Sequence, residues 1–186
     1  MSAPHPAPGP GHRGSKTPSP WIVRFAPLVP AGGAVLDLAC GRGRHTRYFL
    51  DRGHPVVAID IDLSGIEDGL DHPRLEAMQA DLEDGRPFPL ATRRFAGVVV
   101  TNYLYRPLFP SLVSAVASGG VLIYETFARG NERFGKPRNP DHLLIPGELL
   151  EAVRGALRVV AYEDLVVEVP RPAAVQRICA VNDGSA

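Results

Sequence analysis

Short apolar runs rich in Val, Ile and Leu recur along this sequence, and amphipathic stretches separate them. This alternation limits the fold more than any other feature, because it is typical of a parallel sheet covered by helices. The runs show little internal alternation of polar and apolar residues, which indicates strands that are buried on both faces. The predicted parallel strands are 34–39, 55–60, 75–81, 95–102 and 121–127.

Prolines and one capping pattern predict where the helices begin. Pro20, Pro110 and Pro146 each suit the first turn of a helix, where a missing N–H removes no helical hydrogen bond. Ser64 followed by Glu67 matches a capping box, in which two side chains satisfy free backbone N–H groups. The predicted helices are 21–28, 44–51, 64–70, a helix after Pro110 with Leu112, Val113 and Val116 on one face, and a helix after Pro146 that carries Leu149, Leu150, Val153 and Leu157.

Two further apolar runs, 158–169 and 175–181, end the chain and are separated by Pro170-Arg171-Pro172. A connection this short permits only an antiparallel hairpin. The expected fold is therefore α/β: a Rossmann-like, doubly wound, mostly parallel seven-stranded sheet with a C-terminal antiparallel hairpin.

Composition sets the domain organisation. A chain of 186 residues, 45% of them hydrophobic, is long enough for one well-buried core and too short for two ordinary enzyme domains. Residues 1–20 are dominated by Pro, Gly, Ser and His, so we expect a disordered tail followed by one domain over 21–186. No apolar run is long enough for a membrane span and no export signal is visible, which predicts a cytoplasmic protein.

Charge and ligand-type residues exclude several partners. The formal net charge is zero, which argues against a surface built to bind nucleic-acid phosphates. Cys40 and Cys179 lie far apart and are expected to be reduced thiols. No metal is expected. Apart from His142 in the segment 128–145, the histidines show no metal-ligand spacing: His5, His12, His45, His54 and His72.

The segment Val35-Leu36-Asp37-Leu38-Ala39-Cys40-Gly41-Arg42-Gly43 predicts a buried strand that ends in a glycine-rich turn and enters a helix. Gly41 and Gly43 allow a sharp turn and close approach of a ligand, while the helix presents free N–H groups to an anion. Either a carboxylate or a phosphate fits such a turn. A dinucleotide is disfavoured, because Thr46 replaces the third glycine of that fingerprint and is expected to obstruct close packing of helix on strand.

Acidic residues follow two more of the predicted strands. Asp60 ends one strand and is placed to accept hydrogen bonds from ribose hydroxyls, with Asp62 as a close alternative. Asp81 ends the next strand, where it is placed to receive an adenine amino group. An Asp at or near the end of each of three strands predicts a nucleoside site along one edge of the sheet.

In this order of motifs the chain resembles the class I S-adenosylmethionine-dependent methyltransferases, over roughly residues 21–181. The resemblance implies a seven-stranded sheet with one reversed strand, with S-adenosylmethionine as cofactor. Within that family, the chain is similar to small bacterial methyltransferases of the tellurite-resistance and thiopurine type. The implied cofactor contacts are Asp37, Gly41 and Gly43 for the methionine part, Asp60 for the ribose, Asp81 with Leu82 for the adenine, and Thr101 and Asn102 beside the methyl group, with Ala39 and Ile61 completing the predicted set.

The acceptor side carries weaker signals. The segment 101–106 departs from the Asp/Asn-Pro-Pro-Tyr/Phe motif of enzymes that methylate amino groups, which disfavours that class. Tyr103 and Tyr105 either line the acceptor pocket or pack under the cofactor. Tyr103, Glu125 and His142 are the predicted catalytic residues, and the last two are the candidate bases for a hydroxyl acceptor; a thiolate or metalloid anion needs none.

The segment 128–145 has no clear periodicity, and a loop this long is usually functional or disordered. Its basic residues, Arg129, Arg133, Lys136 and Arg138, predict a lid over an anionic acceptor, although solvated charges on a surface loop explain them equally well. The sequence thus predicts a methyltransferase of a small, anionic molecule. The alternatives are a protein or RNA acceptor, a different nucleotide-binding enzyme, and a domain that binds the cofactor or a partner without catalysis.

Overall fold

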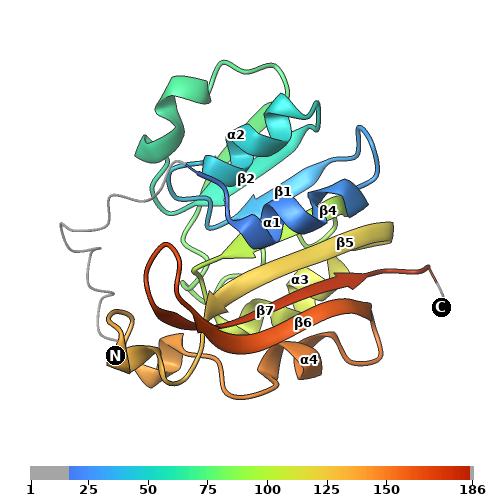
Figure 1. Cartoon of the computed structure of the whole chain (residues 1–186). Coiled ribbons are helices and arrows are strands. Elements are labelled where there is room, and N and C mark those ends of the chain that lie inside the picture. Colours follow the sequence, from blue (N-terminus) through green and yellow to red (C-terminus); the bar gives the residue numbers. More distant parts are fainter. Residues whose placement is uncertain (1–16, 185–186) are drawn as a thin grey trace.

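The computed structural model describes residues 17–184, and seven strands form one sheet in the order β3-β2-β1-β4-β5-β7-β6 (Figure 1). The first five strands are mutually parallel, and β7 runs antiparallel between β5 and β6. The predicted α/β fold and its closing hairpin are therefore confirmed. The strands are β1 (Val35–Leu38), β2 (Val56–Asp60), β3 (Leu75–Gln79), β4 (Phe95–Thr101), β5 (Val116–Phe127), β6 (Arg158–Val167) and β7 (Ala173–Val181).

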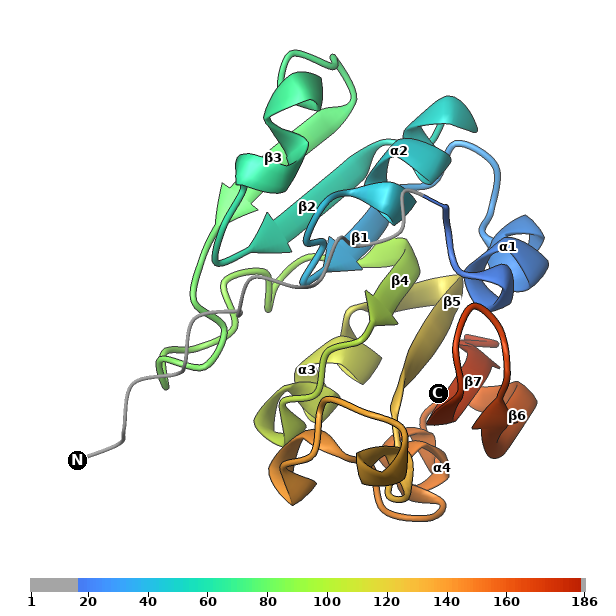
Figure 2. The same cartoon turned by 60° about the vertical axis from the view of Figure 1, so that its left-hand side comes forward.

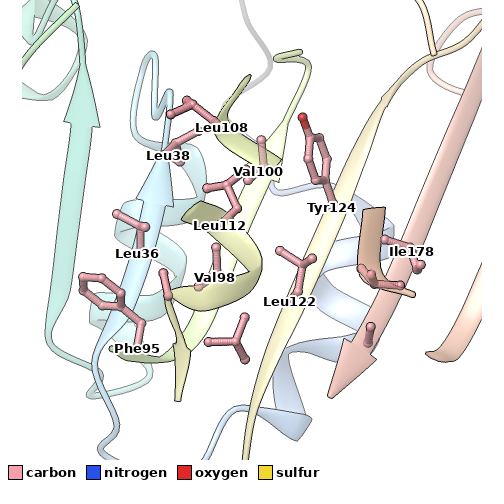
Figure 3. Close-up of a cluster of buried hydrophobic side chains, with 14 of the residues drawn as sticks. Leu36, Leu38, Phe95, Val98, Val100, Leu108, Leu112, Leu122, Tyr124 and Ile178 are labelled. Atoms are coloured by element: carbon pink, nitrogen blue, oxygen red, sulfur yellow. The ribbon is translucent and has the colours of Figure 1, made fainter. Parts of the chain in front are cut away.

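Helices cover both faces of the sheet. On one face, Trp21 and Phe49 pack in a cluster with Val121 of β5; on the other, Leu112 and Leu149 pack with Leu122 (Figure 3). Neighbouring residues of β5 thus enter opposite layers, as the alternation of side chains along a strand requires. The helices are α1 (Pro20–Phe25), α2 (Arg44–Asp51), α3 (Phe109–Ser114) and α4 (Glu148–Val153), with short 3₁₀ helices at Ala26–Leu28, Ser64–Gly69, Arg106–Leu108, Asn131–Arg133 and Pro140–His142.

The sheet edge that matters for function is the one where β1 to β5 end. Parallel strands place their carboxyl ends together, and ligands of open α/β sheets bind there. Because β7 is reversed, it begins at this edge: Val175 pairs with Phe127, the last residue of β5. The β6–β7 turn therefore reaches the same edge.

The strand bounds lie within two residues of the prediction except at the start of β5. β3 ends at Gln79 rather than at Asp81, because the Asp81 carboxylate accepts the backbone N–H of Glu83 and turns the chain. β5 begins at Val116, which was predicted on the preceding helix. Val116 pairs with Phe95 of β4, and the tight passage of Gly120 past backbone oxygens lets the strand continue toward Val121.

The capping box predicted at Ser64 is wrong. Ser64 is the first residue of a 3₁₀ helix rather than the cap of an α-helix, and the preceding Leu63 makes no side-chain capping bond. The Ser64 N–H instead donates to Asp62 Oδ1 at 2.9 Å. Asp62 therefore accepts the backbone N–H that the Glu67 side chain was expected to accept.

The predicted tail lies mostly outside the described residues. Ser19 is 4% exposed and Pro20 begins α1, so the folded domain includes both residues. Within residues 17–184, no helix is long and apolar enough to cross a membrane.

Candidate active site

The turn between β1 and α2 leaves one glycine open and encloses the other; it can be followed in Figure 2. Gly41 has φ +53° and open space where a Cβ would stand. Gly43 has φ +67°, and a Cβ there would lie 2.3 Å from Ile66 Cγ2. Gly43 is therefore required by packing, whereas Gly41 leaves a bare backbone surface for a ligand.

Two residues at this edge carry backbone strain. Ala39 after β1 and Asn102 after β4 have φ of 53° and 56°, and within residues 17–184 they are the only non-glycine residues with positive φ. Asn tolerates this region, but a Cβ such as that of Ala clashes with the following carbonyl. Strained backbone concentrates at functional sites, and here it lies at the ends of two paired strands.

Asp37 lies beneath the turn and is 1% exposed. Burial raises the pKa of its carboxyl from 3.8 to about 6, against the opposing effect of hydrogen bonds from Thr46. Thr46 Oγ1 donates to Asp37 Oδ2 at 2.6 Å. The Thr46 hydroxyl thus joins α2 to β1 at the position where a dinucleotide fingerprint has its third glycine.

Asp60 closes the other side of the turn. Its Oδ2 accepts the N–H of Gly41 at 2.8 Å, and its Oδ1 accepts the N–H of Asp62 at 3.1 Å. Ile61 beside it is 58% exposed. The glycine turn and the end of β2, predicted separately, are in direct contact.

Asp81 and Leu82 follow β3 at the same edge. Asp81 is exposed and Leu82 half-buried. The Ala80 N–H donates to the Asp60 carbonyl at 2.9 Å, which holds the start of this segment beside β2. The predicted adenine residues therefore lie next to the predicted ribose residue, and their roles stay a prediction.

A cavity of about 580 Å³ opens at the ends of β4 and β5. It brings together three of the predicted residues, Asn102, Tyr103 and His142. Thr126 and Phe127 from the end of β5 line it as well. Asn102, whose φ is positive, lines this cavity, and the resemblance implies that the methyl group lies beside it.

Three cations from two separate segments line this cavity. Lys136 and Arg138 belong to the segment 128–145, and Arg171 comes from the β6–β7 turn. Glu83 is the one acidic side chain among the described residues that line the cavity. Lys136 and Arg138 were named from the sequence, whereas Arg171 was missed. No sequence pattern indicates that the β6–β7 turn lies near the end of β4.

The segment 128–145 is held at both ends. Ala128 forms a parallel bridge with Leu144, and both are buried. Arg106 pairs with Glu148 at 2.6 Å and donates to the Leu143 carbonyl at 3.0 Å. The segment 128–145 is therefore a loop with fixed ends. Its residues 136–139 and His142 line the cavity.

The three predicted catalytic residues differ in their surroundings. Burial, with a further contribution from the Glu83 carboxylate, raises the pKa of the Tyr103 hydroxyl, so this side chain is a hydrogen-bond donor at neutral pH and not a base. Within residues 17–184 the Tyr103 hydroxyl has no hydrogen bond of ordinary geometry. His142 lines the same cavity and is half-buried. Its role as a base stays a prediction.

Glu125 lies at the centre of an ion-pair network outside the cavity lining. Its carboxylate accepts hydrogen bonds from Ser19 Oγ at 2.7 Å and from Arg177 Nη1 at 3.1 Å. Arg177 also stacks over Trp21 at 4.9 Å. These contacts fix α1 against β5 and β7 and argue against a free catalytic base at Glu125, a role that stays untested.

His45 was missed as a site residue. Its Nε2 accepts the Ser19 N–H at 3.1 Å, and its Nδ1 lies 3.4 Å from Thr101 Oγ1. Burial, with the positive charge of Arg44, lowers the pKa of His45 from 6.5 to about 3, so the ring is neutral. A neutral His45 thus connects α1, α2 and the end of β4.

A second recess of about 640 Å³ lies at the opposite edge, where β5 begins. It contains none of the predicted site residues. Across residues 17–184, no three His, Cys, Asp or Glu side chains converge in a way that could hold a metal ion. Both cysteines are buried free thiols.

Replacing Ala39 by Gly should stabilise the protein. Gly adopts positive φ without a Cβ clash, so we expect a gain of about 1 kcal/mol in the free energy of unfolding. Urea denaturation measures it. Ala77→Gly in β3, where φ is not positive, is the control and should be destabilising. Equal losses in both variants would show that Ala39 is unstrained.

The pH dependence of stability should change when His45 is replaced by Gln. A histidine whose pKa is lowered by folding contributes stability above pH 6.5 that is lost as pH falls toward 3. The stability advantage of the wild type over His45→Gln should therefore shrink by about 2 kcal/mol between about pH 7.5 and pH 4.5.

The comparison must be made between variants. The raised pKa of Asp37 acts in the opposite direction, because its contribution is lost as pH rises from about 4 to about 6. His72→Gln, at a half-buried histidine outside the network, is the control. A pH-independent difference between wild type and His45→Gln would contradict the neutral buried ring.

Residues 35–119 match the family model described as a methyltransferase domain. Among curated proteins, the chain is similar to the malonyl-(acyl-carrier protein) O-methyltransferase of Salmonella typhimurium, with 31% identity over 103 residues. That match covers 53% of this chain and 40% of the relative, so the chain spans about two-fifths of the relative's length.

Solved structures share the fold at low identity. TehB from Haemophilus influenzae has a TM-score of 0.65 at 17% identity, covering 87% of this chain and 61% of that one. A methyltransferase from Mesorhizobium loti has a TM-score of 0.66 at 19% identity, covering 85% and 95%. The glycopeptide N-methyltransferase MtfA, solved with S-adenosylhomocysteine, has a TM-score of 0.59 at 22% identity, covering 87% and 88%. Residues 35–119 are thus similar to a methyltransferase domain, and the chain has the fold of S-adenosylmethionine-dependent methyltransferases.

Proposed function

We propose that this chain transfers the methyl group of S-adenosylmethionine to a small anionic acceptor held in the cavity at the ends of β4 and β5. The strongest support is the contact between the open Gly41 turn and Asp60, which brings a bare backbone surface and a carboxylate together at the ends of β1 and β2. The match of residues 35–119 to a methyltransferase domain and the similar fold of MtfA, solved with S-adenosylhomocysteine, support the same cofactor.

The residues at the edge fit this cofactor. Gly41 leaves space against its backbone, and Asp60 offers two carboxylate oxygens to ribose hydroxyls. The exposed Ile61 and half-buried Leu82 offer apolar surface to the adenine. Asp37 and the turn would hold the methionine part.

When bound, S-adenosylmethionine supplies a methyl group on a positively charged sulfur. The remaining work of the protein is to hold the acceptor in line with that group, a positioning role that needs no covalent intermediate. Asn102 and Tyr103 line the cavity directly after the end of β4. A protonated Tyr103 orients the acceptor by donating a hydrogen bond, and His142 is the candidate base for a hydroxyl acceptor.

The charge of the cavity favours an anionic acceptor. Lys136, Arg138 and Arg171 oppose the single carboxylate of Glu83. Leu104 and Phe127 add apolar lining. A small molecule with an apolar body and a carboxylate or similar anion matches both features, since guanidinium groups bind planar anions through paired hydrogen bonds.

Calorimetric titration with S-adenosylhomocysteine tests the cofactor assignment. We expect the wild type to bind it and not NADH. Asp60→Ala should weaken binding roughly 10- to 100-fold, because hydrogen bonds to a charged group are lost. Asp71→Ala, at an exposed position away from the turn, is the control. Unchanged affinity in Asp60→Ala would overturn the site assignment.

Matched acid and amide pairs of small phenols and thiols test the acceptor. S-adenosylhomocysteine release should show turnover of acids in preference to their amides. In the variant Lys136→Gln/Arg138→Gln/Arg171→Gln, KM for the acids should rise about tenfold or more, with a smaller change in kcat. Arg94→Gln at the opposite recess is the control. Amides that serve as well as acids, or no turnover of either, would count against an anionic acceptor.

A further inference from the structure

The cavity at the ends of β4 and β5 receives opposite charges from opposite sides of β4. Glu83 belongs to the connection after β3, the strand at one edge of the sheet. Lys136 and Arg138 follow β5, and Arg171 precedes β7, on the other side of β4. A molecule in this cavity therefore meets a carboxylate from the β3 side and cations from the β5 and β7 side.

Glu83 differs from the other half-buried glutamates within residues 17–184. Each of the others is paired with an arginine: Glu125 and Glu163 with Arg177, and Glu148 with Arg106. In the same part of the chain, no cation is in ion-pair contact with the Glu83 carboxylate. Glu83 is thus the member of this group whose carboxylate faces a cavity instead of an ion-pair partner.

Two hydrogen bonds hold the backbone that carries Glu83. Its N–H donates to Asp81 Oδ1 at 2.9 Å, the bond that turns the chain after β3. The Ala80 N–H donates to the Asp60 carbonyl at 2.9 Å, which anchors the same segment on β2. The Glu83 carboxylate therefore enters the cavity from a backbone with a defined position.

The Tyr103 hydroxyl lies near this carboxylate and lacks a partner. Both residues line the cavity, and within residues 17–184 the buried Tyr103 hydroxyl has no hydrogen bond of ordinary geometry. Burial, and next the charge of Glu83, raise the pKa of this hydroxyl. The Tyr124 hydroxyl donates to the Tyr103 carbonyl at 2.9 Å and fixes the backbone. A buried hydroxyl without a partner is costly, and a ligand that bonds to it removes this cost.

A hydroxyl group on the acceptor satisfies both side chains at once. Its oxygen accepts a hydrogen bond from Tyr103, and its hydrogen is donated to Glu83. Asn102, beside which the resemblance places the methyl group, directly precedes Tyr103. A molecule with a hydroxyl at one end and an anion at the other matches the opposite charges across this cavity.

We propose that Glu83 is the general base for a hydroxy-acid acceptor, an assignment that rests on the proposed function. As the acceptor oxygen bonds to the methyl carbon, the carbon–sulfur bond breaks and its electron pair stays on sulfur. The hydroxyl proton passes to the Glu83 carboxylate. One positive and one negative charge disappear together, so the total charge is unchanged. A positioned base accelerates such a step by roughly 100-fold or more.

Binding without turnover tests the hydroxyl contact. The full chain is loaded with S-adenosylhomocysteine and titrated by calorimetry with benzoate, 3-hydroxybenzoate and 4-hydroxybenzoate. The wild type should bind at least one hydroxybenzoate about tenfold more tightly than benzoate, because a hydrogen bond to a charged group is gained. Glu83→Gln should lose most of this preference. Its affinity for S-adenosylhomocysteine should stay unchanged, which shows that the variant is folded.

Exchange of oxygen for sulfur tests the proton transfer. At about pH 8 an aromatic thiol is already a thiolate and needs no base, whereas a phenol keeps its proton. Glu83→Gln should lower kcat for the hydroxybenzoate roughly 100-fold and keep kcat for the matching mercaptobenzoate within about threefold. Glu83→Asp should restore part of the loss. Asp84→Asn removes a neighbouring carboxylate that pairs with Arg86 outside the cavity lining, and it is the control.

Three results would overturn the base assignment alone. These are equal losses for the phenol and the thiol in Glu83→Gln, loss of phenol turnover in His142→Gln but not in Glu83→Gln, and equal affinity of the wild type for benzoate and both hydroxybenzoates. Binding of none of the acids would contradict the anionic acceptor of the proposed function, and the base assignment with it. Binding of S-adenosylhomocysteine would then still support the cofactor assignment.

Discussion

A single buried hydrogen bond, from Thr46 Oγ1 to Asp37 Oδ2, holds the start of α2 against the end of β1. The glycine turn spans the gap between these two residues, so its shape depends on this contact. Burying a carboxylate is costly, and apolar packing of the same volume is often more stable. Here the buried carboxylate of Asp37 lies directly under the glycine turn. Departures from the usual rules of stability are expected at functional sites.

The same edge is tied to distant parts of the chain. Ser19 bonds to both His45 and Glu125, so the segment before α1 is joined to α2 and to β5. Arg177 continues the network onto β7. These bonds join α2, β5 and β7 to the start of α1. Because His45 also lies 3.4 Å from Thr101 Oγ1, the positions of the glycine turn and of Thr101 depend on how α1 packs.

The parts of the fold that were predictable have local signals. β2 and the glycine turn were found because a buried parallel strand is a continuous apolar run and a turn needs glycine. Signals that depend on pairing were not found: β5 begins at Val116 because it meets Phe95, and the glycine pair before Val121 hid this. Ser19 and Glu125 are 106 positions apart, and no local pattern encodes such a contact.

The reversed direction of β7 has a consequence for how such a protein can change over evolutionary time. It brings the β6–β7 turn and the segment 128–145 to the same cavity, and both are loops outside the half of the sheet that carries the glycine turn. Loops tolerate insertion and substitution far better than strands do. Substitutions in these two loops can therefore change the shape and charge of the cavity without altering the strands that hold the glycine turn.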